Sequence, residues 1–316
     1  MATPEPALAA TLCVVGDVAV MRRAMAWAGV KRPLLSLTGL DEIETLPPGC
    51  VAVWQPAGMP AGLLDCPMGH IDALAGAAAA LCIEAAVQAI QAGQADAVVT
   101  APIHKEALHA AGIGYPGHTE MLQALAARGG DVVPVRMMLA NEELRVVLVT
   151  IHCSLRQAID LISVERVLET LRIAQRAMLS FGITAPRIAV AGLNPHAGEG
   201  GLFGDEEVRH IAPAIAQARA EGINASGPYA PDTVFMRARD AAGHPGEFDV
   251  VVAMTHDHGL IPVKYLGVEQ GVNVTLGLPF VRTSPDHGTA FDLAGSGLAD
   301  PSSLKAALAQ AARMLV

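Results

Sequence analysis

The chain alternates short apolar runs, rich in β-branched residues, with longer windows whose apolar positions recur at helical spacing. The short runs predict strands, and the longer windows predict helices. Such alternation is typical of parallel or mixed sheets covered by helices on both faces. Strands are expected at 11–17, 49–56, 95–102, 186–196, 223–229, 248–254 and 271–277, a hairpin at 137–152, and helices at 18–30, 71–92, 163–181, 205–221 and 300–315.

Composition narrows the class of protein. A length of 316 residues suits two domains or one large α/β unit. With 52% hydrophobic and 16% charged residues the chain is not a disordered protein. A net charge of −10 without any basic run argues against a nucleic-acid partner. The alanine-rich window 71–90 carries charged residues and predicts a packed helix, so no membrane partner is expected. Five cysteines without CxxC spacing suit reduced thiols, and we expect a cytoplasmic protein.

Three histidines, His152, His196 and His256, each stand just past a predicted strand. If the three strands end at one edge of a sheet, the imidazoles could converge. Three neutral imidazoles that leave one position open are a catalytic metal arrangement. A histidine at a strand end can also be structural, and sequence spacing alone does not decide between these readings.

Further polar clusters also follow predicted strands. His118 and Thr119 could meet an anion at a helix start, or Thr119 could simply cap that helix. Asn273 and Arg282 are candidates for a substrate anion, with a surface arginine as the alternative. Glycines at 198, 200, 201 and 204 would let the backbone approach a ligand closely, but no GxGxxG dinucleotide fingerprint occurs in the chain.

Several of these blocks together resemble a known family. The segments TAPIHKEALHAAG, YPGHTE, GLNPHAGEGG and GVNVTLGLPFVRTSPDHGTA are similar to the signature blocks of the 4-hydroxythreonine-4-phosphate dehydrogenase (PdxA) family. The resemblance runs in order from about Val14 to the C-terminus. It implies two α/β/α domains with a cleft between them, like isocitrate and isopropylmalate dehydrogenases, and a homodimer. The expected domains are 1–120 plus 278–316, with the cofactor adenosine segment, and 121–277, with the metal histidines and dimer contacts.

The resemblance also implies the site. His152, His196 and His256 become ligands of a divalent metal (Zn, Co, Mn or Mg), and the cofactor becomes NAD or NADP. Substrate-binding residues become His118, Thr119, Lys264, Asn273 and Arg282. The segment DHGTAFDLAGSGLADP resembles the adenosine cradle of isocitrate dehydrogenases, which assigns cofactor contacts to His287, Gly288, Thr289, Ala290 and Asp292. His118, Asp257 and Lys264 remain alternative acid–base groups.

The implied reaction is NAD(P)-linked oxidation of 4-phosphooxy-threonine with decarboxylation to 3-amino-2-oxopropyl phosphate, a step of pyridoxal phosphate (pyridoxine) biosynthesis. Alternatives are a dehydrogenase of threonate or erythronate 4-phosphate or of an aromatic cis-dihydrodiol carboxylate, and an inactive homologue that binds metal and ligand. Two departures from the family pattern bear on this choice. A leading strand with a GDPAGIGPE-type loop is expected to be missing, and His258 stands where the family has glutamine.

Overall fold

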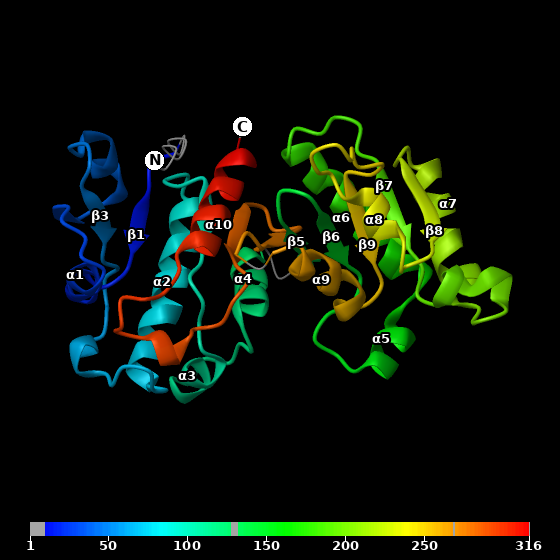
Figure 1. Cartoon of the computed structure of the whole chain (residues 1–316). Helices are drawn as coiled ribbons and strands as arrows, with labels where there is room; N and C mark the ends of the chain where they lie inside the picture. Colours follow the sequence, from blue (N-terminus) through cyan, green and yellow to red (C-terminus); the bar gives the residue numbers. More distant parts are fainter. Residues whose placement is uncertain (1–9, 128–131, 268, 316) are drawn as a thin grey trace. The chain divides into compact units, whose positions relative to one another are not determined.

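The computed structural model describes residues 10–127, 132–267 and 269–315. The chain forms two compact units, unit 1 (Met1–Val133 and His287–Pro301) and unit 2 (Pro134–Asp286 and Ser302–Val316). These bounds differ from the expected domains: residues 121–133 belong to unit 1, and residues 278–286 and 302–316 belong to unit 2. At the C-terminal end the physical reason is that β11 (Val281–Pro285) pairs antiparallel with β10 (Val272–Leu276), and α10 (Ser302–Arg313) packs against both strands (Figure 1). Residues 121–126 stay in unit 1 because they belong to α4 (His118–Ala126), which packs against α2 (Ala73–Gln91).

Unit 1 contains a parallel three-stranded sheet in the order β1-β3-β2. The apolar runs at these strands are only three or four residues long, and each is followed by a turn or helix. The elements of unit 1 are β1 Cys13–Val15, α1 Val18–Trp27, β2 Leu34–Leu37, η1 Leu40–Thr45, β3 Val51–Trp54, η2 Leu63–Asp65, α2 Ala73–Gln91, β4 Ala97–Val99, α3 Lys105–Ala110, α4 His118–Ala126 and η5 Phe291–Leu293.

Helix α2 is the central helix of unit 1. Its first turn is capped by Asp72, whose carboxylate accepts the backbone N–H groups of Leu74 and Ala75. Seven of its residues, mostly alanines, are buried, and α3, α4, β1 and β4 pack around it. Among the described residues α2 alone is long and apolar enough to cross a membrane by length and composition, which is weak evidence for such a role. Its packing is that of the core helix expected from the sequence.

Small side chains let α2 approach α3 closely. A Cβ atom at Gly76 would collide with the carbonyl oxygen and carbon of Ala107, both backbone atoms of α3. Gly76 and Ala107 are both buried. The alanine-rich composition of this window is therefore what the helix–helix contact needs.

Unit 2 is built on a mixed sheet in which the strand order runs β11-β10-β5-β6-β9-β7-β8. Strands β6, β9, β7 and β8 are parallel neighbours, and β5, β10 and β11 add antiparallel pairs. The elements of unit 2 not yet given are β5 Arg136–Ala140, β6 Arg145–Leu148, α5 Leu155–Leu161, α6 Val164–Ser180, β7 Ile188–Ala191, η3 Pro195–Gly201, η4 Glu207–Ile211, α7 Ala212–Ala220, β8 Ala225–Tyr229, α8 Val234–Ala238, β9 Val250–Ala253 and α9 His256–Tyr265.

Helices cover both faces of this sheet (Figure 1). On one face α8 and α9 contribute Val234, Phe235, Leu260 and Val263 to a buried apolar cluster with alternate residues of β6, β7 and β9. Helices α6 and α7 pack from the other face. The central strands β7 and β9 are buried at every position, which explains their uninterrupted apolar sequences IAVA and VVVA.

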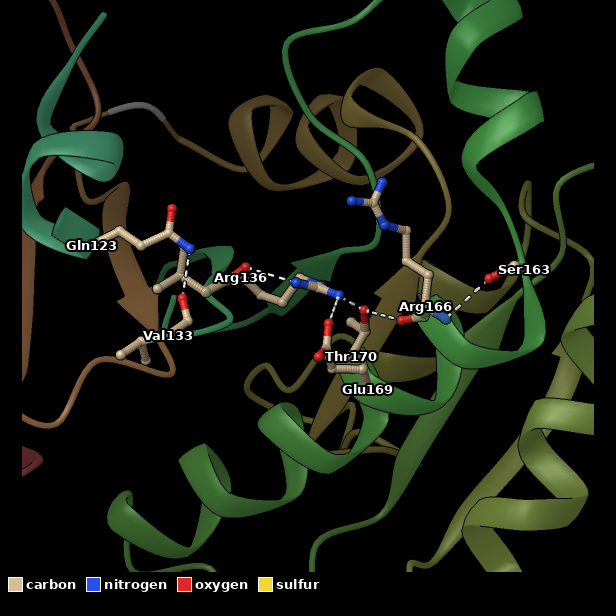
Figure 2. Close-up of polar contacts among 8 residues, drawn as sticks. Gln123, Val133, Arg136, Ser163, Arg166, Glu169 and Thr170 are labelled. Carbon is tan, nitrogen blue, oxygen red and sulfur yellow. Dashed lines mark hydrogen bonds and ion pairs between the residues drawn. The ribbon is translucent and has the colours of Figure 1, made fainter. Parts of the chain in front are cut away.

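An arginine joins β5 to α6 at the edge of the sheet where β6 ends (Figure 2). The Arg136 guanidinium donates to Thr170 Oγ1 at 2.7 Å and to Glu169 Oε2 at 2.6 Å. Burial lowers the pKa of Arg136, although Glu169 opposes this by favouring the charged form. The same guanidinium donates to the carbonyl oxygen of Val135 at 2.8 Å, so this largely buried cation makes three hydrogen bonds, two of which hold α6 against the sheet.

The predicted α/β class is confirmed, as is the hairpin at 137–152, which is the antiparallel pair β5–β6. The sequence did not predict β2 or β11. Each is short and lies close to a proline or a glycine, so its pattern resembles a loop.

Candidate active site

The three histidines follow the ends of three neighbouring parallel strands in unit 2. Strand β9 pairs with β6 on one side and with β7 on the other, in parallel. His152 follows β6, His256 follows β9 and His196 follows β7. Parallel strands end at the same edge of a sheet, so all three histidines leave this edge, where open α/β sheets bind ligands.

His152 and His256 lie against each other. Their ring centroids are 5.7 Å apart and their planes are tilted by 45°. His256 Nδ1 lies 2.7 Å from the carboxylate oxygen Oδ1 of Asp257. An Nδ1–H donated to Asp257 leaves the lone pair of Nε2 for a metal ion, the carboxylate–histidine arrangement that orients metal-binding imidazoles. Asp257, one of the expected acid–base candidates, is thus placed to orient His256.

His196 lies in a turn of left-handed backbone. Residues 196–200 all have positive φ, including His196 (φ 53°), Ala197 (φ 52°) and Glu199 (φ 44°). Left-handed backbone costs about 1–2 kcal/mol for each residue that carries a Cβ atom. The His196 ring is near that of Phe203, with centroids 6.1 Å apart. The sequence therefore holds His196 in a strained conformation that the surrounding residues must stabilise.

The geometry gives a partial match to a metal centre. The structure brings His152 and His256 into ring contact and places His196 at the same edge. Across residues 10–127, 132–267 and 269–315, no three His, Cys, Asp or Glu side chains form a group ready to hold a metal ion. The donor chemistry nevertheless fits a divalent metal, because imidazole nitrogens suit zinc, cobalt and manganese.

Lys264 forms an ion pair that the sequence did not reveal. It lies near the end of α9, and its Nζ is 2.8 Å from Oδ2 of Asp286, the residue that follows β11. Asp286 is mostly buried, whereas the Lys264 side chain is 42% exposed. The exposed ammonium can still meet an acidic group of a ligand. Asp286 is the first residue of the DHGTA segment identified in the sequence. Its pairing with Lys264 could not be predicted, because the two residues are far apart along the chain.

Asn273 and Arg282 lie on one face of the β10–β11 pair. The antiparallel register sets Asn273 opposite Ser284, so Thr275 and Arg282 share their face. Arg282 is 4% exposed and donates to Thr275 Oγ1 at 2.9 Å. Burial lowers the pKa of Arg282 to about 10, which leaves the guanidinium charged at neutral pH. A buried cation on the same face of the strand pair as an amide is suited to a carboxylate or phosphate.

The remaining expected residues belong to unit 1. His118 and Thr119 are the first residues of α4, after Gly117, which makes no side-chain cap. Because glycine has no side chain, no N-cap side chain competes with an anion for the first-turn N–H groups of α4.

The expected cofactor segment forms a loop around η5. His287 Nδ1 lies 2.9 Å from the carbonyl oxygen of Gly288, and Ala290 has left-handed backbone with φ 46°. Thr289 and Asp292 lie in the same loop. Phe291 anchors it by stacking on His104, with ring centroids 4.8 Å apart and planes 20° apart. This stacking could not be predicted from the sequence, because the two rings are far apart along the chain.

Comparison with known proteins gives the family. A family model described as "Pyridoxal phosphate biosynthetic protein PdxA" matches residues 8–311. A 4-hydroxythreonine-4-phosphate dehydrogenase of Beijerinckia indica is 53% identical over 310 residues, which is 96% of this chain and 86% of the relative. A D-threonate 4-phosphate dehydrogenase of Salmonella typhimurium is 44% identical over 298 residues, 93% of this chain and 87% of the relative.

The fold agrees with these similarities. The crystal structure of a 4-hydroxythreonine-4-phosphate dehydrogenase from Klebsiella pneumoniae matches with a TM-score of 0.85 at 43% identity, covering 98% of this chain and 91% of the other. Both the sequence blocks and the α/β architecture are therefore shared over nearly the whole length. The chain belongs to the PdxA family.

Proposed function

We propose that this chain is an NAD(P)-dependent dehydrogenase that oxidises 4-phosphooxy-threonine and releases carbon dioxide, in pyridoxal phosphate biosynthesis. The observation that carries the proposal is the placement of His152, His196 and His256 at the ends of three adjacent parallel strands. Membership of a family whose relatives are named as dehydrogenases of this substrate supports it.

In this proposal the three histidines hold a divalent cation, which would polarise the substrate hydroxyl and stabilise negative charge on oxygen. Asp257 orients His256 through the 2.7 Å contact at Nδ1. With Asp257 in this role, His118 is the remaining candidate to accept the hydroxyl proton. Lys264 would accept it only as the neutral amine, and not as the ammonium that pairs with Asp286. A bound nicotinamide would supply the hydride acceptor for the carbon that bears the hydroxyl, and the resulting β-keto acid would lose carbon dioxide.

Anion recognition falls to the cationic residues. Arg282 with Asn273, and Lys264 beside Asp286, are proposed to bind the carboxylate and phosphate of the substrate, together with His118 and Thr119. His287, Gly288, Thr289, Ala290 and Asp292 are proposed to hold the adenosine of NAD or NADP. In this arrangement the two units would form the two-domain, isocitrate dehydrogenase-like architecture with a cleft.

A cytoplasmic homodimer is part of the same proposal. Unit 2 exposes large apolar side chains near the histidines, including Leu155 and Ile159, one turn apart on α5, and Leu202 and Phe203, after η3. Exposed apolar surface of this kind favours association. Light scattering would then give the mass of two chains, and the mass of one chain would contradict it.

A screen of cofactor reduction tests the proposed activity. Absorbance of NADH or NADPH is followed with 4-phosphooxy-threonine, threonate and erythronate 4-phosphates and an aromatic cis-dihydrodiol carboxylate, each with zinc, cobalt, manganese or magnesium. We expect kcat/KM for 4-phosphooxy-threonine to exceed the others by at least about tenfold, a transition-state difference of about 1.4 kcal/mol. One carbon dioxide should be released per reduced cofactor, and unphosphorylated hydroxythreonine serves as the control.

A second candidate function is oxidation of threonate 4-phosphate, favoured by the 44% identity to an enzyme of that name. The two substrates differ at one carbon, which bears an amino group in one and a hydroxyl in the other. A preference for threonate 4-phosphate would replace the first proposal with this one. Failure to reduce either cofactor with any substrate would contradict both and leave the chain as a homologue that only binds ligands.

A further inference from the structure

The loop that carries His196 surrounds a buried carboxylate. This loop, residues 193–204 (the His196 loop), follows β7 and contains the left-handed turn. Glu207 begins the π-helical turn that leads into α7, and it is only 3% exposed. A buried carboxylate needs hydrogen-bond donors around it, and the donors here come from the loop.

Both oxygens of Glu207 bind the start of the loop. Oε1 accepts the backbone N–H groups of Leu193 at 2.7 Å and of Asn194 at 2.8 Å. Oε2 accepts from the side-chain amide of Asn194 at 2.9 Å. The same amide nitrogen donates to Glu206 Oε2 at 2.7 Å. Hydrogen bonds to an ionised carboxylate are stronger than those between neutral groups.

The backbone at Gly198, within the loop, and at Gly192, just before it, also lies close to this carboxylate. A Cβ atom at Gly198 would lie 2.7 Å from Glu207 Oε2, and one at Gly192 would lie 3.0 Å from Oε1. Two glycines of the GLNPHAGEGG block therefore leave space for Glu207. His196 lies between the hydrogen-bonded residue Asn194 and the closely packed residue Gly198.

We propose that Glu207 is the positioning residue for His196. Its carboxylate stabilises the left-handed turn that aims the imidazole, although Glu207 itself touches neither substrate nor metal. The inference rests on the proposed role of His196 as a metal ligand. It adds that the buried acid of the GDEE segment is required for that role, whereas its neighbour Glu206 is not.

The test uses Glu207→Gln with Glu206→Gln as the matched control. Glutamine at 207 has the same shape, but its amide nitrogen must face either the N–H donors or Asn194 Nδ2. Rotation of the Asn194 amide would turn its oxygen toward the new amide nitrogen at position 207. The same oxygen would then face the Glu206 carboxylate, which is also an acceptor. The control removes a charge from the adjacent residue, whose carboxylate binds only the Asn194 side chain among the hydrogen bonds described above.

Two measurements are made on the full-length protein. Hydrogen exchange of the metal-free protein should be at least about fivefold faster in peptides covering 192–204 for Glu207→Gln, and unchanged for the control. The zinc dissociation constant, from competition with a chelator, should rise by about 10- to 100-fold for Glu207→Gln and by less than about twofold for the control. In a His196→Ala background, Glu207→Gln should weaken zinc binding no further, which a general structural defect would not predict.

Unchanged exchange in the His196 loop would overturn the proposal, and so would faster exchange without weaker zinc binding. If Glu207→Gln does not fold, Asn194→Ala replaces it. This change removes the side-chain amide that donates to both Glu207 Oε2 and Glu206 Oε2, but it keeps the two backbone N–H donors to Glu207 Oε1. It should therefore give smaller effects in the same direction. Zinc binding by His196→Ala as tight as wild type would refute the proposed metal centre instead. The exchange result would then decide separately whether Glu207 holds the loop.

Discussion

Replacing His256 with alanine should lower kcat/KM for the proposed oxidation by at least about a thousandfold, equivalent to about 4 kcal/mol of transition-state stabilisation. His256 is at the centre of the histidine group: β9 lies between β6 and β7, and the His256 ring contacts that of His152. Its removal also leaves Asp257 without the imidazole that it orients. Initial rates of NAD(P) reduction and zinc content by mass spectrometry measure the effect.

His244→Ala provides the control for this variant. His244 is an exposed histidine of the same unit, and its Nδ1 contacts the carbonyl oxygen of Arg239. This substitution should leave both activity and zinc content within about twofold of wild type. A His256→Ala protein that is folded and keeps more than a tenth of the wild-type kcat/KM would contradict the assignment of His256.

Replacing Gly76 with alanine should destabilise unit 1 by about 3 kcal/mol. Helix propensity alone predicts the opposite, because alanine in a helix interior is favoured over glycine by about 1 kcal/mol. The added Cβ atom would collide with the backbone of Ala107, which cannot move without displacing α3 from α2. The free energy of unfolding, from urea titration, therefore decides between propensity and packing by its sign.

Gly114→Ala is the matched control in the same unit. A Cβ atom there meets nothing within 4 Å, and the backbone of Gly114 is not left-handed. Its effect should stay within about 0.5 kcal/mol. A Gly76→Ala protein as stable as wild type, or more stable, would show that α2 and α3 do not approach as closely as described.

The sequence predicted the α/β class and the histidines at strand ends because these depend on local patterns. Buried parallel strands are continuous apolar runs, and a polar residue directly after such a run is visible in the sequence. The order of strands in a sheet depends on pairing between segments that are distant in sequence. The pairing of β9 with β6 and β7 therefore could not be predicted from the spacing of the histidines. The same holds for the unit boundary, which depends on the pairing of β11 with β10.

The residues that support the site were harder to find than the candidate ligands. Glu207 stands among three consecutive acidic residues, a pattern typical of a solvated helix start, and only the fold shows that it is buried. Asp286 forms an ion pair with Lys264, and Phe291 stacks on His104; in both pairs the partners are distant in sequence. Such tertiary contacts form only in the folded chain, and they could not be predicted from a single sequence.

Diffraction at the zinc absorption edge from crystals grown with zinc would show whether His152, His196 and His256 together hold a metal ion. We expect one anomalous peak in unit 2, about 2.0–2.1 Å from a ring nitrogen of each of His152, His196 and His256. Binding requires the three imidazoles to come together around the ion, because the described side chains do not form such a group without it. A zinc ion held by other residues, or no peak at these three histidines, would contradict the account.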